Sequence, residues 1–567
     1  MLASAGLSGA AVAQEPGRVD DAALRQAPAT EWLTYGRDYG EQRYSPLEQV
    51  HTGNVDQLEL AWSWEIEGTP GLLESTPLVS NGVLYATGAW NVVFALDART
   101  GDVRWTWDPA IVRGGPSEGG PDTCCGAINR GVALYGGKVY TGLLDGRLVA
   151  LDAETGRLVW VRQTTPVGSN YTITGAPRIV KGNVIIGNGG AEYHGVRGYV
   201  TAYDAETGEQ VWRTYTVPGD PSLPFESPAM EMAAETWEGE WWRYGGGGTA
   251  WDSFSFDPEA DLLYVGTGNG APWNHVHRSE GTGDNLFLAS ILALDPDTGA
   301  LVWYYQTVPG DTWDYTATMT MILADLEIGG EQRQVLMQAP KNGFFYVLDR
   351  RTGELLAADP ITEHINWASG VDLETGRPIE TPSARYGTGE VWIMPHTGGT
   401  HNWHPMSFHP GTGLVYIPGQ NGASLHRFEP AWEPSGLGEF STGTIRDHGR
   451  ITEPGPEPAP TGFLLAWDPV NREERWRIPY EAHRRNGGTL ATAGDLVFSG
   501  RIDGWIYAHH AATGEKLWEY PIGRAPASPI TYELDGRQYL TILSGAPSGG
   551  DTTAGRVWTF VLGGGLP

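Results

Sequence analysis

Cysteine is almost absent from this chain of 567 residues, which contains only the adjacent pair Cys124 and Cys125. Zinc sites use cysteines that are separated by two or more residues and occur in several pairs, so this pair does not predict one. A relaxed disulfide joins Cα atoms about 4.4–6.8 Å apart, whereas neighbours across a trans peptide are about 3.8 Å apart. The two residues therefore form either a strained disulfide, of the kind that persists at functional sites, or two buried free thiols.

Basic residues are also scarce. Lys and Arg total 37 against 68 Asp and Glu, which gives a formal net charge of −31. A chain this acidic cannot neutralise phosphates, so it is not predicted to bind nucleic acid. The charge either keeps the protein soluble or steers a cationic protein partner towards it. The sequence also lacks an apolar run of about 18 residues, so it predicts no transmembrane helix.

The first residues resemble a targeting segment more than part of a fold. Residues 1–13 lack a basic n-region but end in the small residues Ala11-Val12-Ala13. This ending is typical of a secretory signal peptide. We expect residues 1–13 to be the remnant of such a peptide, a mature chain that starts near Gln14, and a periplasmic location. An oxidising compartment of this kind favours a bond between the two cysteines.

Glycine, proline and tryptophan are abundant, with 79, 39 and 24 residues. Glycine and tryptophan recur within a unit that reads Ala-x-Asp-x-x-Thr-Gly-x-x-x-Trp, and a repeated unit of this kind marks a repeated supersecondary structure. Clear copies span 95–105, 150–160, 202–212 and 293–303, weaker copies span 347–357, 466–476 and 508–518, and a hairpin at 407–418 keeps the turn without the Trp.

The chemistry of the unit indicates a β-hairpin. Apolar and β-branched residues such as 199–203 favour a strand, Asp and Gly favour the turn, and the Trp ring can pack between neighbouring units. Further strands precede the units, for example 83–87, 138–142 and 184–187, so each unit holds about four. We therefore predict an all-β fold, an eight-bladed β-propeller of four-stranded antiparallel blades with tryptophan-docking repeats, forming one domain over residues 14–567. The strand at 58–62 is expected to complete the last blade.

The repeat and the adjacent cysteines together resemble the quinoprotein alcohol dehydrogenases, methanol and ethanol dehydrogenase-like propellers that bind pyrroloquinoline quinone (PQQ) and Ca²⁺. The resemblance runs from Trp32 to Phe560. The sequence has no Cys-x-x-Cys-His motif, so the resemblance is to the soluble type without a haem domain. The matching motifs are Tyr35-Gly36-Arg37-Asp38, Cys124-Cys125, Asn129-Arg130-Gly131, Gly190-Ala191-Glu192, Gly266-Thr267-Gly268-Asn269 and Trp313-Asp314-Tyr315.

This resemblance implies a cofactor site. Cys124 and Cys125 match the disulfide that lies against one face of the PQQ ring, and Trp251 matches the indole on the other face. PQQ carries three carboxylates, which require positive charge and hydrogen-bond donors nearby. The other cofactor-binding positions that the resemblance implies are Glu74, Arg130, Thr174, Gly190, Ala191, Thr249, Lys341, Asn402 and Trp403.

The resemblance also implies a metal site and a catalytic base. Glu192, Asn269 and Asp314 match the protein ligands of Ca²⁺, a hard ion that prefers oxygen donors. Related lanthanide enzymes carry an extra Asp two positions after the catalytic Asp, and here that position is Thr316, which favours Ca²⁺. Asp314 matches the base that takes the alcohol proton while hydride passes to the quinone. Electrons would then leave to a soluble c-type cytochrome, and the acidic chain suits a basic one.

Two positions depart from the family pattern. Relatives carry Trp-Asn-Gly-Gly where this chain reads Arg485-Asn486-Gly487-Gly488, and Gly-Trp-Gly-Gly where it reads Gly545-Ala546-Pro547-Ser548-Gly549-Gly550. Two bulky rings near the mouth of the channel are therefore missing. We expect a wider entrance and a secondary or bulky alcohol as the substrate.

Two other functions share part of this pattern. A non-catalytic propeller scaffold would need the repeat but neither the cysteine pair nor the set Glu192, Asn269 and Asp314. A PQQ sugar dehydrogenase would use the same cofactor, and the cysteine pair favours the alcohol branch over it.

Overall fold

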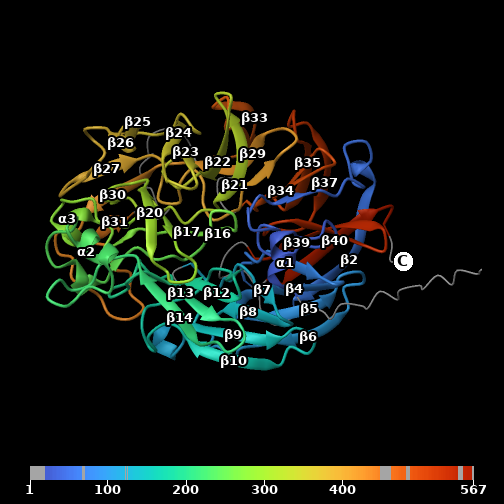
Figure 1. The fold of residues 1–567 in the computed structure, drawn as a ribbon, viewed down its shortest axis with the longest axis horizontal. Helices are drawn as coiled ribbons and strands as arrows, with labels where there is room; N and C mark the ends of the chain where they lie inside the picture. Colours follow the sequence, from blue (N-terminus) through green and yellow to red (C-terminus); the bar gives the residue numbers. More distant parts are fainter. Residues whose placement is uncertain are drawn as a thin grey trace, which may run out of the picture.

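The sheets of the protein follow one another around a ring in the order of the sequence (Figure 1). The structure is a computed structural model, and it describes residues 19–66, 71–121, 123, 125–446, 461–480, 486–546 and 553–564. The signal-peptide remnant predicted at residues 1–13 lies outside these ranges.

Most of the strands among the described residues belong to antiparallel sheets of four strands, and seven sheets are of this kind. In chain order, the first four contain β3 (Leu78–Ser80), β4 (Val83–Thr87), β5 (Val93–Asp97) and β6 (Val103–Trp107); β7 (Ala133–Tyr135), β8 (Lys138–Gly142), β9 (Arg147–Asp152) and β10 (Leu158–Gln163); β11 (Arg178–Val180), β12 (Asn183–Gly187), β13 (Tyr199–Asp204) and β14 (Gln210–Tyr215); and β16 (Phe254–Asp257), β17 (Leu262–Gly266), β19 (Ser290–Leu294) and β20 (Leu301–Gln306).

The later sheets continue the series. They contain β21 (Ile322–Ile328), β22 (Glu331–Gln338), β23 (Phe344–Asp349) and β24 (Leu355–Pro360); β28 (Ser407–His409), β29 (Leu414–Asn421), β32 (Thr461–Asp468) and β33 (Glu473–Tyr480); and β38 (Ile530–Leu534), β39 (Arg537–Ser544), β40 (Gly555–Leu562) and β2 (Leu58–Ile66). A sheet of five strands joins β34 (Thr489–Thr492), β35 (Leu496–Arg501), β36 (Trp505–His510) and β37 (Lys516–Pro521) to the short parallel strand β1 (Tyr44–Ser45).

Small elements fill the connections. They are the pair β15 (Gly246–Gly247) and β18 (Gly270–Ala271), the hairpin β25 (Ala368–Asp372) and β26 (Arg377–Glu380), the sheet of β27 (Glu390–Ile393), β30 (Ser424–Phe428) and β31 (Thr444–Arg446), the α-helices α1 (Asp21–Arg25), α2 (Pro228–Ala234) and α3 (His275–Ser279), and the 3₁₀ turns η1 (Val55–Gln57), η2 (Ala89–Asn91), η3 (Pro116–Glu118) and η4 (Trp241–Tyr244). No helix among the described residues is long and apolar enough to cross a membrane.

The turn of the repeated unit forms as its sequence predicts. In the copy at 150–160, the Asp152 carboxylate accepts hydrogen bonds from the backbone and hydroxyl of Thr155, at 2.8 and 2.7 Å. Gly156 follows with a φ of +70°, a conformation that glycine adopts without strain. The turn therefore reverses the chain between β9 and β10.

The tryptophan of one sheet lies on the turn of the next. The indole of Trp105 donates a 3.0 Å hydrogen bond to the Ala153 carbonyl, and a Cβ on Gly156 would lie 2.6 Å from the Trp105 ring. Glycine is thus required at position 156 both because the Trp105 ring leaves no room for a side chain and because the backbone φ is positive. The same indole-to-carbonyl contact occurs for Trp160 with Ala205, Trp212 with Pro296, Trp476 with Ala511 and Trp518 with Leu58.

The structure corrects one step of the repeat count. The hairpin at 407–418 is β28 and β29, and β29 pairs with β32, which carries the copy at 466–476. The hairpin is therefore the first half of an existing unit. The remaining sheet contains β38, β39 and β40, which carry no copy of the motif, together with β2.

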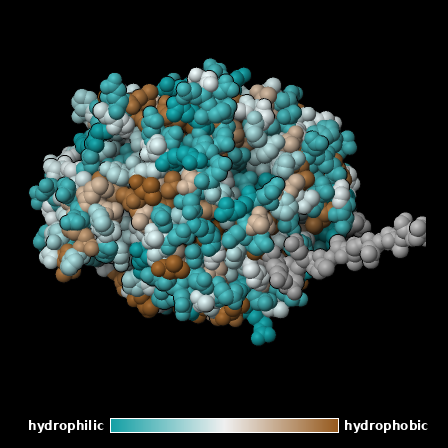
Figure 2. All heavy atoms as spheres, in the orientation of Figure 1, coloured by the Kyte–Doolittle hydropathy of each residue, from teal (hydrophilic) through white to brown (hydrophobic). Residues whose placement is uncertain are grey.

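Among the described residues, the first long strand pairs with the last. β2 runs antiparallel to β40, with Leu58 opposite Leu562 and Ile66 opposite Gly555. This pairing confirms the expectation that the strand at 58–62 completes the last unit. Hydrophilic residues cover most of the face seen in Figure 2, with apolar ones in small groups, in keeping with the net charge of −31.

Candidate active site

A cavity of about 490 Å³ lies among the loops that connect the sheets. Its wall contains nearly all of the residues that the sequence predicts for the site. The lining residues are Glu74, Cys125, Ile128, Arg130, Thr172, Thr174, Gly189, Gly190, Glu192, Trp251, Asn269, Trp273, Asp314, Lys341, Asn402, Trp403 and Phe440.

The regular order of the sheets explains why distant residues meet here. Glu74, Arg130, Thr174 and Trp251 stand just before β3, β7, β11 and β16, the first strands of four successive sheets. Each sheet therefore brings the same position of its leading loop to the cavity. The sheets fix the positions of the loops, and the loops carry the side chains that line the cavity.

Three predicted residues are not on this wall. Ala191 is buried beside Glu192, and Thr249 is fully buried with its hydroxyl lacking a hydrogen-bond partner among the described residues. Cys124 lies outside the described residues, so its bond to Cys125 remains a prediction. Cys125 itself lines the cavity.

Arg130 is the cationic centre of one side of the cavity. Its guanidinium lies 2.8 Å from a Glu74 oxygen, donates a 2.8 Å bond to the Thr174 hydroxyl and approaches Asp252 at 3.8 Å. The guanidinium carbon lies 4.8 Å from the centroid of the Trp251 ring. Burial disfavours the charged form, but the carboxylates of Glu74 and Asp252 offset it, and the pKa of Arg130 is raised. Arg130 is therefore a cation held in place by buried acids.

Asp314 and Lys341 face each other on another side. The Lys341 ammonium lies 3.1 Å from Oδ1 of Asp314 and donates a 3.0 Å bond to the carbonyl of the same residue. Asp314 has a φ of +66°, which aspartate tolerates better than most residues. The backbone N–H groups of Trp313 and Tyr315, on either side, donate to the carboxylate of Asp311 at 3.2 and 3.0 Å. Asp311 thus holds the turn that presents Asp314.

The amide of Asn269 adjoins the Asp314 carboxylate. In the amide orientation that satisfies both neighbours, Asn269 donates to Oδ1 of Asp314 at 3.3 Å and accepts from the Trp273 indole at 2.9 Å. Glu192 is half-buried, and its carbonyl accepts a 2.9 Å bond from Ser441. Two carboxylates and one amide, all oxygen donors, therefore belong to one wall.

Sequence reasoning missed two aromatic residues of the wall, Trp273 and Phe440. Phe440 belongs to a connection far along the chain, and its ring lies 5.2 Å from that of Tyr193. Neither residue occupies a repeat position or one of the matched motifs. Only the packing of the connections over the cavity reveals them.

The family described as PQQ: glucose/ethanol/alcohol dehydrogenase, beta-propeller domain, matches residues 32–378 and 458–540 of this chain. The chain belongs to this family. The expectation of a PQQ-dependent alcohol dehydrogenase is confirmed at this level, as is an all-β propeller fold built of four-stranded antiparallel sheets.

Relatives within the family are similar over most of their length. The quinohemoprotein alcohol dehydrogenase ADH IIB of Pseudomonas putida is 52% identical over 535 residues, which are 93% of this chain and 75% of that one. The crystal structure of the quinohemoprotein alcohol dehydrogenase of Comamonas testosteroni is 50% identical, with a TM-score of 0.90 over 97% of this chain and 83% of that chain. A europium-containing methanol dehydrogenase is 34% identical, with a TM-score of 0.84 over 95% of this chain and 99% of that chain.

The cavity fits the cofactor of the family. Its volume of about 490 Å³ is in the range of small-molecule sites. Arg130 and Lys341 supply positive charge for carboxylates, and the Trp251 indole supplies an apolar wall. The buried Nε of Arg130 has no hydrogen-bond partner among the described residues, which suits a polar ligand.

The oxygen donors fit a hard cation that is completed from outside the protein. No group of three or more His, Cys, Asp and Glu side chains in the described part of the chain is arranged to hold a metal. Glu192, Asn269 and Asp314 would therefore need further oxygens from a ligand. Thr316 is not on the wall, and its hydroxyl lies 3.1 Å from that of Thr318.

A second cavity of about 340 Å³ shares Glu74, Cys125, Asn402 and Trp403 with the first, and Asn486 lines it. Arg485 and residues 547–552 lie outside the described residues. Ala546 is fully buried and lines neither cavity. The expectation that a small residue at 546 widens the entrance is therefore not met, because this side chain points into packed protein.

Proposed function

We propose that the chain oxidises an alcohol with PQQ and Ca²⁺ held in the larger cavity. The observation that carries this proposal is that Glu192, Asn269 and Asp314 share one wall with Arg130, Lys341 and Trp251. An acid–base group, a cation site and a place for an anionic planar ring are thus side by side.

The residues of the chain have distinct roles in this proposal. Asp314 accepts the proton of the substrate hydroxyl, and Lys341 orients its carboxylate through the contact at 3.1 Å. Arg130 and Lys341 bind carboxylates of the cofactor, while Glu74, Thr174, Gly190, Ala191, Thr249, Asn402 and Trp403 position it. PQQ supplies the two-electron oxidation when bound, and Ca²⁺ supplies Lewis acidity.

Cys124 and Cys125 form a vicinal disulfide wall in this proposal. The support is that Cys125 lines both cavities. Alkylation of the denatured protein without reductant measures the pair directly. A bonded pair gains no alkyl groups by mass spectrometry, whereas two free thiols gain two.

The substrate is a secondary or bulky alcohol in our proposal, and its carbon chain packs against Trp273 and Phe440. These rings belong to the apolar part of the wall, which also contains Ile128, Trp251 and Trp403, and Phe440 is 49% exposed. The size of the substrate therefore depends on residue 440 rather than on residue 546.

Further parts of the proposal concern the fold and the cell. We assign one domain over residues 14–567 with eight blades docked by tryptophan, supported by the sheets and indole contacts above. A signal peptide would carry the protein to the periplasm, where a soluble basic c-type cytochrome accepts its electrons. The net charge of −31 supports the choice of a basic partner.

One experiment tests the central proposal. The protein is reconstituted with PQQ and Ca²⁺, and dye reduction is measured with primary, secondary and polycyclic alcohols and with glucose. Alcohol-dependent reduction, absent in Asp314→Asn although that variant still binds PQQ, is the expected result. Activity with glucose alone would assign a sugar dehydrogenase, and no activity with any substrate would refute the proposal.

A further inference from the structure

Arg278 is a buried arginine that no sequence motif singled out. It lies at the end of α3 and is 1% exposed, and burial lowers its pKa to about 10. Its Nη1 donates to the carbonyls of Pro272 and Trp273 at 2.7 and 2.8 Å, its Nη2 donates to the carbonyl of Asp311, and its Nε donates to Asn285 at 3.0 Å. One guanidinium therefore joins two separate stretches of backbone.

The first stretch carries Asn269. Gly270 packs so closely on Arg278 that a Cβ there would lie 2.3 Å from Nη1. Trp273, whose carbonyl accepts from Arg278, donates its indole N–H to the Asn269 amide. The position of Asn269 is therefore set by the guanidinium through Gly270 and Trp273, which follow it in the chain.

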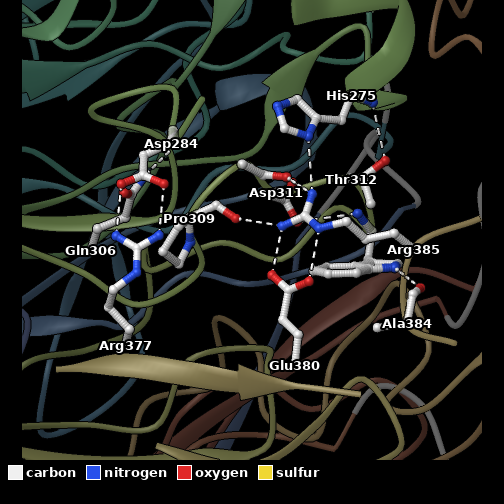
Figure 3. Close-up of polar contacts among 12 residues, drawn as sticks. His275, Asp284, Gln306, Pro309, Asp311, Thr312, Arg377, Glu380, Ala384 and Arg385 are labelled. Atoms are coloured by element: carbon white, nitrogen blue, oxygen red, sulfur yellow. Dashed lines mark hydrogen bonds and ion pairs between the residues drawn. The ribbon is translucent and has the colours of Figure 1, made fainter. Parts of the chain in front are cut away.

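The second stretch carries Asp314, and its carbonyls are held in succession. Arg385 donates to the carbonyls of Pro309 and Gly310 at 2.9 and 2.8 Å and is itself bound by Glu380 (Figure 3). Arg278 takes the next carbonyl, that of Asp311. The backbone carbonyls that Arg385 contacts all belong to this stretch, although its guanidinium also contacts His275 and Glu380. Arg278 donates to carbonyls of this stretch and of the stretch that carries Asn269.

We infer that Arg278 is a positioning residue that fixes the spacing between Asn269 and Asp314, and thereby the affinity of the site for Ca²⁺. The inference rests on the proposed function, since it assigns both residues to the metal. A guanidinium can bridge three carbonyls because its N–H groups diverge in a rigid plane. A lysine keeps the charge but cannot span both stretches.

The test is isothermal titration calorimetry, in which Ca²⁺ is titrated into the PQQ-loaded protein. Arg278→Lys should bind Ca²⁺ at least about tenfold more weakly, as expected for loss of a group that orients metal ligands. Its kcat should recover at saturating Ca²⁺ with an unchanged KM for alcohol, which damage to the fold would not allow. Arg350→Lys is the matched control, because Arg350 is 7% exposed, donates to the Ala324 carbonyl at 3.0 Å and lies on neither cavity wall.

Two further outcomes are decisive. If Arg278→Lys does not fold, Asn285→Gly removes the acceptor of Nε at a residue whose φ of +54° suits glycine, and it should weaken Ca²⁺ binding in the same direction. If these variants bind Ca²⁺ as tightly as the unmodified chain does, the inference is overturned and the proposed function still stands. Absence of Ca²⁺ binding by the unmodified chain itself overturns both.

Discussion

The ammonium nitrogen of Lys341 contacts Asp314 twice, at 3.1 Å from the carboxylate and at 3.0 Å from the backbone carbonyl. One side chain therefore fixes both the backbone and the reactive group of the proposed base. In the function proposed above, Lys341 would therefore act in the geometry of proton transfer as well as in cofactor binding.

Lys341→Met should lower kcat by about a hundredfold, because a misplaced base loses most of the benefit of general base catalysis. Lys341→Arg, which keeps the charge, should retain more activity. Steady-state assays at saturating PQQ and Ca²⁺ measure this. A kcat for Lys341→Met within twofold of the unmodified enzyme would contradict the role.

The neutral state of His275 predicts a stability change with pH. Burial, together with Arg278 and Arg385, lowers its pKa to about 2, and its Nδ1 lies 3.0 Å from the Arg385 guanidinium (Figure 3). The unfolded chain takes up this proton near pH 6.5 whereas the folded protein does not, so the contribution to stability is present above pH 6.5 and is lost as the pH falls towards 2.

Denaturant unfolding of the unmodified chain and of His275→Gln measures this effect. The free energy of unfolding of the unmodified chain, relative to the variant, should fall by about 1.2 kcal/mol between pH 6 and pH 5. A difference that does not change with pH would show that His275 takes up a proton as readily in the folded protein as in the unfolded chain.

Phe440→Ala should raise kcat/KM for polycyclic alcohols by about tenfold relative to ethanol, because the ring limits the space at the wall of the cavity. Leu437→Ala is the control, since Leu437 lies in the same connection, is 53% exposed and does not line the cavity. Parallel assays with the two alcohols give the ratio. If the ratio of the two kcat/KM values is the same in both variants, the substrate does not pack against Phe440.

The acidic charge predicts how electron transfer responds to salt. The rate constant for reduction of a basic c-type cytochrome should fall by about tenfold between low and high ionic strength, because salt screens steering. Stopped-flow mixing of the substrate-reduced enzyme with the cytochrome measures it. An acidic cytochrome serves as the control, and a salt-independent rate with the basic one would remove the electrostatic argument.

Local chemistry made the repeated turn predictable, since Asp152 and Gly156 act within their own hairpin. The hairpin at 407–418 was misplaced because 39 residues, 422–460, separate β29 from the strand it pairs with. Ala546 shows another limit, because a missing ring in the sequence does not tell which way the side chain points. Arg278 acts through backbone carbonyl groups, and the sequence does not show which carbonyls an arginine contacts.

The pairing of β2 with β40 has a consequence for how the protein is made. β40 is made long after β2, so the edge of β2 stays open until β40 has left the ribosome. Contacts between ends this distant in sequence form slowly, and unpaired edges promote aggregation. We therefore expect a chaperone that covers the free edge of β2 until β40 pairs with it to raise the yield of folded protein.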